Sequence, residues 1–372
     1  MMKSVGIIGE YNPFHQGHAY LISETRRMTD AEVVVSVMSG DFTQRGEPAV
    51  RDKWERAESA VKNGINLVIE LPTVFACNSA EFFAGGAVRI LEEMGGIDCL
   101  AFGSECGDIE QLTGAAAFLA EHDAEIQKAA ADLLKHGYSY PRAREAAVLQ
   151  LAPWFDVSLI REPNNILALE YLGSLQTMRP VTVKRRGEQY HASATSLREE
   201  LYREDPHFFD QMEQRYFSHV SARILQSDRE ELERIFASGE GLGNKLKNEI
   251  RYADSVTDLI ERVKSKAYTR TRIARLLTQV LLGIDEACVR NARPYVRLLA
   301  MDAAGGRFIR EIKKAGCCRL PIITNINREK DACEEVRETL AIDILASDMY
   351  NLISGQSLYE YSDYVKSPYI GI

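Results

Sequence analysis

The chain has 372 residues, of which 45% are hydrophobic and 27% are charged, and its net charge at pH 7 is -9. This length and composition are typical of a soluble globular protein with two or three domains. No apolar run is long enough to span a membrane, and the run that follows residue 4 is too short for a signal peptide. Seven cysteines without a CxxC pair predict reduced thiols in a cytoplasm and argue against a zinc site.

The charge is unevenly distributed along the chain. Residues 1–200 carry 19 Lys and Arg against 28 Asp and Glu, whereas residues 201–372 carry 26 of each. Within the second half, residues 264–330 hold 15 basic and 5 acidic side chains. This local excess predicts a surface for a polyanion such as RNA, and the alternative is an ordinary solvated helix face.

The first predicted elements surround two histidines. An apolar run at 5–8 predicts a buried strand, Asn12-Pro13 marks a turn, and residues 16–27 have helical periodicity. His15 and His18 therefore lie at a strand-to-helix turn, where free N–H groups and the helix dipole favour a phosphate. In the alternative interpretation, one histidine only caps the helix and the other lies at the surface. The His-x-Gly-His pattern in this context resembles the nucleotidylyltransferase superfamily, whose members transfer a nucleotide α-phosphate and release pyrophosphate.

Strands and helices alternate after this turn. Further strands are predicted at 31–38, 66–71, 99–102 and 181–184, and helices at 51–63, 80–94, 109–136 and 166–175. The alternation predicts an α/β fold in residues 1–204, a Rossmann-like doubly wound parallel sheet of the nucleotidylyltransferase type. Glu70 lies inside an apolar strand, and we expect a buried ionic partner for it.

Polar residues follow the carboxyl ends of these strands, where open α/β sheets bind ligands. Asp41, Thr43, Gln44 and Arg45 follow the strand at 31–38, and they either face an acceptor substrate or form a solvated turn. Gly103 follows the strand at 99–102 and allows a ligand to approach the backbone closely.

Three further features bear on phosphate and nucleotide binding. Arg185 and Arg186 follow the last strand and are candidates to meet a polyphosphate, although paired surface arginines are common. Asn164 or Asn165 is either a helix N-cap or a contact to adenine or ribose. The third feature is a segment similar to the Ser-Ser-Thr-x-x-Arg phosphate motif of the superfamily. Ser193, Thr195 and Arg198 match this motif, and Ala194 replaces its second serine. In the same segment, Ser196 and Glu199 have the spacing of a helix capping box.

Residues 205–372 predict a mainly α-helical C-terminal domain. Helical patterns occur at 223–236, 255–264, 270–282 and 331–352. A basic stretch beside an aromatic residue suits phosphate contacts and base stacking. The candidate RNA-binding residues are Lys264, Lys266, Tyr268, Arg270, Arg272 and Arg275.

Six segments together identify a resemblance that covers most of the chain. They are Gly6 to Leu21, Met38 to Pro48, Leu67 to Pro72, Ser79 to Phe83, Phe102 to Glu105, and Pro163 to Leu167. These segments resemble the bacterial tRNA(Met) cytidine acetate ligase family, and the match is more specific than His-x-Gly-His alone.

The resemblance implies an ATP-dependent ligase that forms acetyl-adenylate and pyrophosphate from acetate, and then acetylates N4 of the wobble cytidine of elongator tRNA(Met). It implies that His15 and His18 stabilise the phosphates and that the basic helical domain binds the anticodon arm. It also implies that Mg²⁺ binds the phosphates of ATP, and the sequence does not identify the protein ligands of this ion. The ATP-binding residues implied are Ile7, Ile8, Gly9, Glu10, Tyr11, Asn12, Pro13, Phe14, His15, Gln16, Gly17, His18, Ala19, Tyr20, Gly103, Asn164, Asn165, Arg185 and Arg186.

Two other functions stay open at the level of the sequence. The chain could be a nucleotidylyltransferase acting on a small metabolite, with the basic stretch as ordinary surface. It could also be a non-enzymatic RNA-binding protein whose nucleotide domain senses ATP. Release of pyrophosphate, and its dependence on acetate, would distinguish the three functions.

Overall fold

The computed structural model describes residues 1–185, 194–239, 241–265, 268–328 and 333–371. In this part of the chain, one sheet has the strand order β5-β4-β1-β2-β3-β6-β7, and β8 pairs with β6. The strands are β1 (Ser4–Gly9), β2 (Val33–Ser39), β3 (Leu67–Leu71), β4 (Cys99–Ser104), β5 (Arg179–Lys184), β6 (Val296–Met301), β7 (Ile322–Ile323) and β8 (Tyr369–Ile370).

Helices surround the sheet and form most of the second half of the chain. None of those in the described ranges is long and apolar enough to cross a membrane. The helices are α1 (Gln16–Thr29), α2 (Lys53–Lys62), α3 (Thr73–Ala76), α4 (Ala80–Met94), α5 (Ile109–Glu121), α6 (Asp123–Lys135), α7 (Tyr140–Leu151), α8 (Pro163–Ser174), α9 (Ala194–Glu204), α10 (Pro206–Gln226), α11 (Arg229–Arg234), α12 (Leu242–Glu249), α13 (Val256–Val263), α14 (Arg270–Leu282), α15 (Glu286–Asn291), α16 (Ala303–Ala315) and α17 (Glu334–Ser354), with 3-10 turns η1 (Val157–Ile160) and η2 (Ile326–Arg328).

Strands β1 to β5 are mutually parallel, which confirms the predicted α/β fold. Their side chains alternate between two apolar clusters, because successive residues of a strand point to opposite faces. Val33, Val35 and Val37 of β2 pack with α4, α8 and α16 on one face, whereas Val34 and Met38 pack with α1 and α2 on the other. Helices on both faces leave β2 and β3 buried along their whole length, as their nearly continuous apolar sequences predict.

The second half of the chain also contributes to the sheet. β6 pairs antiparallel with β3, and β7 and β8 both pair parallel with β6. No strand was predicted after residue 204, because a short and mostly apolar segment such as Val296–Met301 does not by its periodicity distinguish a strand from a buried helix segment. The division after residue 204 stays a prediction, and the described residues beyond it are mainly helical with three added strands.

Two predicted helices are interrupted. The helix expected at 109–136 is α5 followed by α6, with a break at His122. The helix expected at 223–236 ends at Gln226 and resumes at Arg229, because Asp228 forms a capping box with Glu231. In both places the helical periodicity continues across the break, so periodicity alone did not reveal it.

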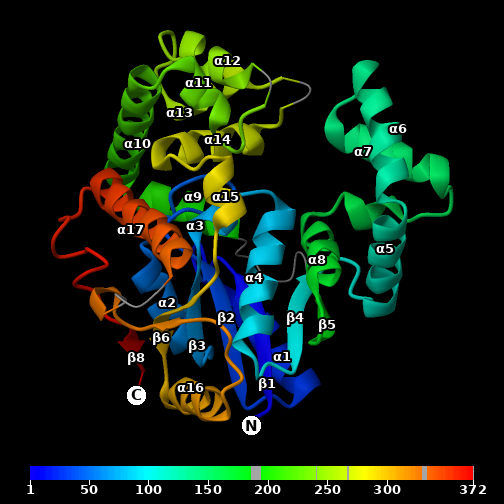
Figure 1. The fold of residues 1–372 in the computed structure, drawn as a ribbon, viewed down its shortest axis with the longest axis vertical. Helices are drawn as coiled ribbons and strands as arrows, with labels where there is room; N and C mark the ends of the chain where they lie inside the picture. Colours follow the sequence, from blue (N-terminus) through cyan, green and yellow to red (C-terminus); the bar gives the residue numbers. More distant parts are fainter. Residues whose placement is uncertain (186–193, 240, 266–267, 329–332, 372) are drawn as a thin grey trace.

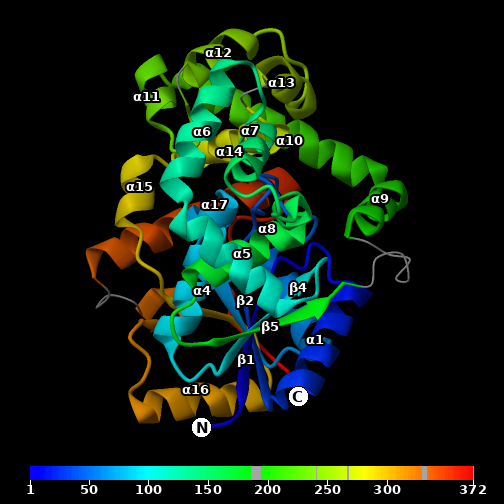
Figure 2. The same cartoon turned by 90° about the vertical axis from the view of Figure 1, so that its right-hand side faces the viewer.

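Helices α10 to α14 gather at one end of the molecule. Figures 1 and 2 show α11 to α13 at that end, whereas α16 and the N-terminus lie at the opposite end. The strands β1 to β5 run from the N-terminal end toward the helical end, so their carboxyl edge faces α14. Any ligand bound at the carboxyl edge therefore lies between the sheet and the helical end.

Helix α14 is attached to the carboxyl edge by side-chain donors on one of its faces. Gly46, in the loop after β2, has φ 79° and packs so closely on α14 that an added Cβ would lie 2.3 Å from the Arg275 nitrogen, so only glycine fits. The donors are Arg275 Nε to the Gln44 carbonyl (2.8 Å), Thr278 Oγ1 to the Gly46 carbonyl (3.0 Å) and Gln279 Nε2 to the Cys77 carbonyl (2.9 Å).

A buried ionic cluster, the Lys53 network, links the two halves and consists of Lys53, Glu70, Arg297 and Asp363. Lys53 Nζ lies 2.7 Å from both Glu70 Oε1 and Asp363 Oδ2. Arg297 Nη1 lies 3.0 Å from Glu70 Oε2 and 2.9 Å from Asp363 Oδ2. The predicted ionic partner of Glu70 is therefore confirmed. A third buried carboxylate, Asp41, lies 3.9 Å from Lys53 Nζ at the edge of the network, and all these groups are out of contact with water.

Candidate active site

Two histidines open helix α1 in what we call the HxGH turn, residues 15 to 18. His15 is the N-cap and its Nδ1 accepts the Gly17 N–H at 3.0 Å, while His18 Nδ1 accepts the His15 N–H at 3.2 Å. The two rings stack with centroids 3.8 Å apart. Because each Nδ1 accepts a backbone N–H, each neutral ring carries its proton on Nε2. The turn therefore presents two N–H donors, and the capping role of His15 leaves its Nε2–H available to a phosphate.

The environment keeps both imidazoles uncharged near neutral pH. Burial, with smaller contributions from the Arg185 and Arg198 guanidinium groups, lowers the pKa of His15 to about 4. Burial, the neighbouring His15 and Arg185 lower the pKa of His18 well below its ordinary value. Neutral rings that donate from Nε2 stabilise charge on a phosphoryl oxygen by hydrogen bonding.

The loop between β1 and α1 is held by arginine side chains from two other elements, α2 and α9, and by one of its own side chains. Arg56 of α2 is fully buried and donates to the Glu10 carbonyl at 2.6 Å and to the Ser39 carbonyl at 3.2 Å. Arg198 of α9 donates to the Asn12 carbonyl at 2.9 Å, and Asn12 Oδ1 accepts the Val50 N–H at 2.8 Å. The sequence analysis missed Arg56, because a basic residue on an amphipathic helix is usually a solvated one.

Gly103 and Arg185 lie side by side at the carboxyl ends of β4 and β5. The two strands pair in parallel, and the Arg185 N–H donates to the Ser104 carbonyl at 2.9 Å. An added Cβ on Gly103 would lie 3.5 Å from Arg185 Cγ, in ordinary contact. Since Arg185 also acts electrostatically on both histidines, the predicted ATP residues of β1, β4 and β5 converge on one region. Arg186 and Ser193 lie outside the described residues.

Asn164 and Asn165 hold the loop after β4. Asn165 Oδ1 accepts the N–H groups of Glu105 and Cys106, each at 3.0 Å, and Asn164 Nδ2 donates to Glu105 Oε1 at 2.6 Å. Neither asparagine is an N-cap, because α8 begins at Pro163 and its N-cap is Glu162. Proline prefers the first helical position, and that cue would have placed the cap correctly.

Helix α9 presents Arg198 to the site with Thr195 beside it. Arg198 Nη2 donates to Thr195 Oγ1 at 3.1 Å. The helix begins at Ala194, so Ser196 lies inside its first turn and the predicted capping box with Glu199 is wrong. The same four-residue pattern occurs within helices, so it identified the helix but not its first residue.

Three comparisons with known proteins agree with this geometry. A family model described as HIGH Nucleotidyl Transferase matches residues 2–363. The tRNA(Met) cytidine acetate ligase of Caldanaerobacter subterraneus subsp. tengcongensis is 38% identical over 94% of this chain and 95% of that protein. The ligase of Clostridium novyi is 33% identical over 99% of both chains. The chain belongs to the tRNA(Met) cytidine acetate ligase family.

A solved structure supports the same assignment. The crystal structure of Thermotoga maritima TmcAL bound with alpha-thio ATP superposes with a TM-score of 0.87, at 30% identity over 99% of each chain. An apo form of the same protein gives the same score, identity and coverage. The resemblance inferred from sequence, the nucleotidylyltransferase type of fold and the membership of an enzyme family are confirmed.

The loop after β2, which the sequence analysis proposed for the acceptor of the ligase reaction, is mostly buried. Asp41 Oδ1 accepts the Lys53 N–H at 2.8 Å and its Oδ2 accepts the Ser347 hydroxyl at 2.6 Å, so this carboxylate is occupied inside the fold. Thr43 is also buried and Arg45 is exposed. Gln44 alone combines partial exposure with a link to the site, since its N–H donates to Glu10 Oε1 at 2.7 Å.

The residues predicted to bind RNA do not share one environment. Lys264 and Arg270 both pair with Glu261. Arg272 stacks on the Tyr268 ring at 4.9 Å, an arrangement compatible with stacking on a base, and Lys266 lies outside the described residues. Arg275 instead points toward the nucleotide domain and bonds the Gln44 carbonyl. The RNA surface of this ligase family member stays a prediction, and Arg275 is the residue least suited to it.

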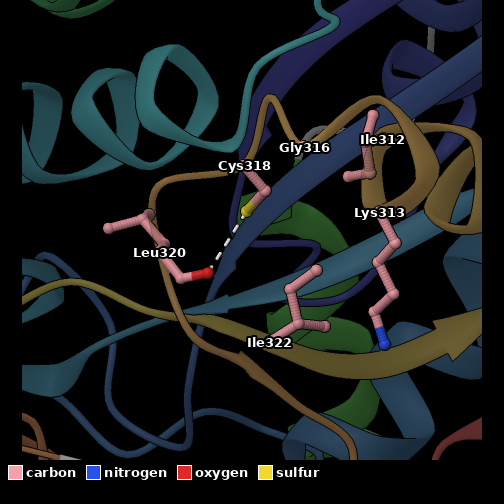
Figure 3. A pocket seen from close by; sticks show the side chains of 6 residues that line it. All are labelled: Ile312, Lys313, Gly316, Cys318, Leu320 and Ile322. Carbon is pink, nitrogen blue, oxygen red and sulfur yellow. Dashed lines mark hydrogen bonds between the residues drawn. The ribbon is translucent and has the colours of Figure 1, made fainter.

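In the described ranges no group of three or more His, Cys, Asp or Glu side chains is arranged to hold a metal ion. A hollow of 330 Å³ at the C-terminal end of α16 shares no residue with the HxGH turn. Figure 3 shows its lining, formed by Ile312, Lys313, Gly316, Cys318, Leu320 and Ile322.

Proposed function

We propose that this chain activates acetate with ATP as acetyl-adenylate and transfers the acetyl group to N4 of the wobble cytidine of elongator tRNA(Met). The observation that carries the proposal is the HxGH turn, with two neutral imidazoles that donate from Nε2 beside Arg185 and Arg198, in a chain of this family. The proposed site of action is the cytoplasm, where tRNA is found.

ATP occupies the carboxyl edge between β1, β4 and β5 in this proposal. The segment from Ile7 to Tyr20 lies along the nucleotide, Gly103 lets the adenosine approach the backbone, and Arg185 with Arg186 meets the phosphates. Asn164 and Asn165 contribute by fixing the loop at Glu105, with one of them in contact with the nucleoside. Mg²⁺ bound to the phosphates would neutralise part of their charge.

The first chemical step needs positioning and charge stabilisation. A carboxylate oxygen of acetate attacks the α-phosphorus, a new O–P bond forms, and the bond to pyrophosphate breaks. His15 and His18 donate hydrogen bonds to phosphoryl oxygens as charge moves onto the leaving group. No covalent enzyme intermediate is needed, because the acid itself is the nucleophile.

In the second step the exocyclic amine of the cytidine attacks the acetyl carbonyl, AMP leaves, and the amine loses a proton. A base in the single-stranded anticodon loop needs little unstacking to reach the mixed anhydride. Arg272 with Tyr268, and the basic residues near them, are the proposed contacts to the anticodon arm.

The test is pyrophosphate release from ATP with and without acetate and tRNA, followed by mass analysis of the tRNA nucleosides. Acetate-dependent release with an acetylated cytidine supports the proposal. Release that is independent of acetate indicates a small-metabolite nucleotidylyltransferase, and ATP binding without release indicates an ATP-sensing RNA-binding protein.

A matched pair of variants locates the chemistry. His18→Ala removes one Nε2 donor and is expected to lower the turnover number by about 10²-fold or more while tRNA binding persists. His136→Ala, at an exposed histidine after α6, is the control and is expected to leave turnover unchanged. Full turnover in His18→Ala would show that the HxGH turn is not the reaction site.

A further inference from the structure

The guanidinium group of Arg275 is only partly used by the protein. Its Nε donates to the Gln44 carbonyl at 2.8 Å, and within the described residues its two terminal amino groups have neither a hydrogen bond nor an ion pair to a carboxylate. The side chain is only partly exposed, and burial is the main cause that lowers the pKa of Arg275. A half-buried guanidinium group whose terminal amino groups bond no carboxylate is suited to an anion that the protein itself does not supply.

The surrounding groups do not neutralise Arg275. Burial raises the pKa of the Cys77 thiol to about 12, so this neighbour is uncharged near neutral pH. The neighbouring Arg272 adds repulsion, which also lowers the pKa of Arg275. Glu10 attracts Arg275 at longer range, and its Oε1 already accepts the Ser39 hydroxyl and the Gln44 N–H. The local balance around Arg275 is therefore positive.

Arg275 also approaches the site from the side expected of an acceptor. Its partner Gln44 is bonded to Glu10, the residue that directly follows β1 and leads into the HxGH turn. In the sheet, β2 lies on one side of β1, and β4 with β5 lies on the other. The proposed nucleotide uses the side of β4 and β5, so the loop after β2 and its partner Arg275 lie on the opposite side of β1, which leaves that side for the acid.

We propose that Arg275 binds the carboxylate of acetate through its two free amino groups and aims one oxygen at the α-phosphorus. The inference rests on the proposed function and adds the residue that recognises the acid. A planar guanidinium fork matches a carboxylate with two parallel hydrogen bonds, which fixes orientation as well as charge.

This assignment differs from the role that the sequence predicted for Arg275 as an RNA contact. Arg272 keeps features of such a contact, with partial exposure and a stacked tyrosine. Arg275, one helical turn further, reaches the loop of the nucleotide domain. The spacing of three residues suggested a shared face, but each of these long side chains finds a different partner.

The experiment compares Arg275→Lys and Arg275→Gln with the full-length wild-type enzyme in pyrophosphate release at saturating ATP and varied acetate. Lysine keeps the charge and loses the fork, so the KM for acetate is expected to rise about tenfold, and glutamine is expected to raise it about 100-fold. The KM for ATP and the tRNA dissociation constant are expected to stay within twofold of wild type. Arg290→Gln, at an exposed pair with Glu286, is the control and leaves all three constants unchanged.

Two further measurements separate recognition of acetate from an effect on folding. The Arg275→Ala enzyme with added guanidinium ion is expected to recover part of its acetate affinity, which a purely structural defect does not allow. The preference for acetate over propionate is expected to fall in Arg275→Lys, because the orienting fork is lost.

Each contrary result overturns the inference. An unchanged KM for acetate in Arg275→Gln excludes contact with the acid, and weaker tRNA binding at an unchanged acetate KM makes Arg275 an RNA contact. The KM values for acetate and ATP and the tRNA dissociation constant could instead all change together with a lower unfolding midpoint and without rescue by guanidinium. In that case the role of Arg275 is structural only, through its hydrogen bond with Gln44. If the wild-type enzyme releases no acetate-dependent pyrophosphate, the proposed function itself fails, and that failure is visible before any variant is made.

Discussion

Gly17 offers a sharp test of the HxGH turn, because a single methyl group there acts directly on a proposed phosphate donor. An alanine Cβ at this position would lie 2.8 Å from Cε1 and 3.0 Å from Nδ1 of the His15 ring. Ordinary van der Waals contact begins at 3.4 Å, so the ring must retreat by tenths of an ångström. The movement carries the His15 Nε2–H away from its position and disturbs its stacking on His18, 3.8 Å away.

The expected effects on activity and on stability differ in size. Misplacing a group that stabilises charge in the transition state costs about 10²-fold in rate, or about 2.7 kcal/mol. Alanine in a helix is more stable than glycine by about 0.5–1 kcal/mol, which offsets part of the strain from the contact. We therefore expect Gly17→Ala to lower the turnover number about 100-fold while its free energy of unfolding stays within about 1 kcal/mol of wild type.

The measurements are steady-state pyrophosphate release and urea unfolding, with Gly114→Ala as the matched control. Gly114 is an exposed glycine inside α5 with no atom within 4 Å of an added Cβ, so this variant gains helix stability and keeps full turnover. Wild-type turnover in Gly17→Ala would refute the reasoning that His15 must hold its place. A large loss of stability would show that the contact is relieved by the backbone instead of by the ring.

Two further predictions concern stability. Because the pKa of His15 is lowered to about 4, the unfolded chain binds more protons than the folded one between about pH 4 and 6.5. The free energy of unfolding should therefore fall as the pH decreases through this range. Between pH 7.5 and pH 5 the His15→Asn variant should lose less of its free energy of unfolding than the wild type does. Equal decreases of the urea midpoint in the two proteins would contradict this prediction. Lys53→Ala leaves Glu70 and Asp363 with less compensation and should lower the free energy of unfolding by about 3–5 kcal/mol. Lys62→Ala, at a solvent-exposed pair with Glu58, should lower it far less; similar losses for the two variants in thermal unfolding would contradict the importance of burial.

Local patterns were sufficient to predict several parts of the site. The strand, the turn and the helix around His15 and His18 follow from neighbouring residues, because a buried strand and a first helical turn are both short-range structures. The positions of Gly103 and Arg185 at strand ends followed from strand order in the same way. The sequence did not reveal Arg56, whose contacts to Glu10 and Ser39 join segments that are distant in the chain.

The patterns failed where one signal fits two structures. The run at 296–301 is too short for its periodicity to choose between strand and helix, and only pairing with β3 decides that it is β6. Asparagine is a common N-cap residue, so Asn164 and Asn165 were both candidates for the cap of α8. Pro163 instead takes the first helical position, and the two amides bind the loop at Glu105.

The sequence by itself determined the fold class, the HxGH turn with its neighbouring strand ends, and the family. Each of these features depends on residues close together in the chain or on the regular order of strands and helices. Both kinds of information can be obtained from the order of the residues alone. Only the tertiary structure decided that Arg275 points into the nucleotide domain, that Glu70 pairs with Lys53 and Arg297, and that both histidines are neutral. Those properties depend on which distant segments meet and on how much water they exclude, because desolvation and partner choice set the charge and direction of a side chain.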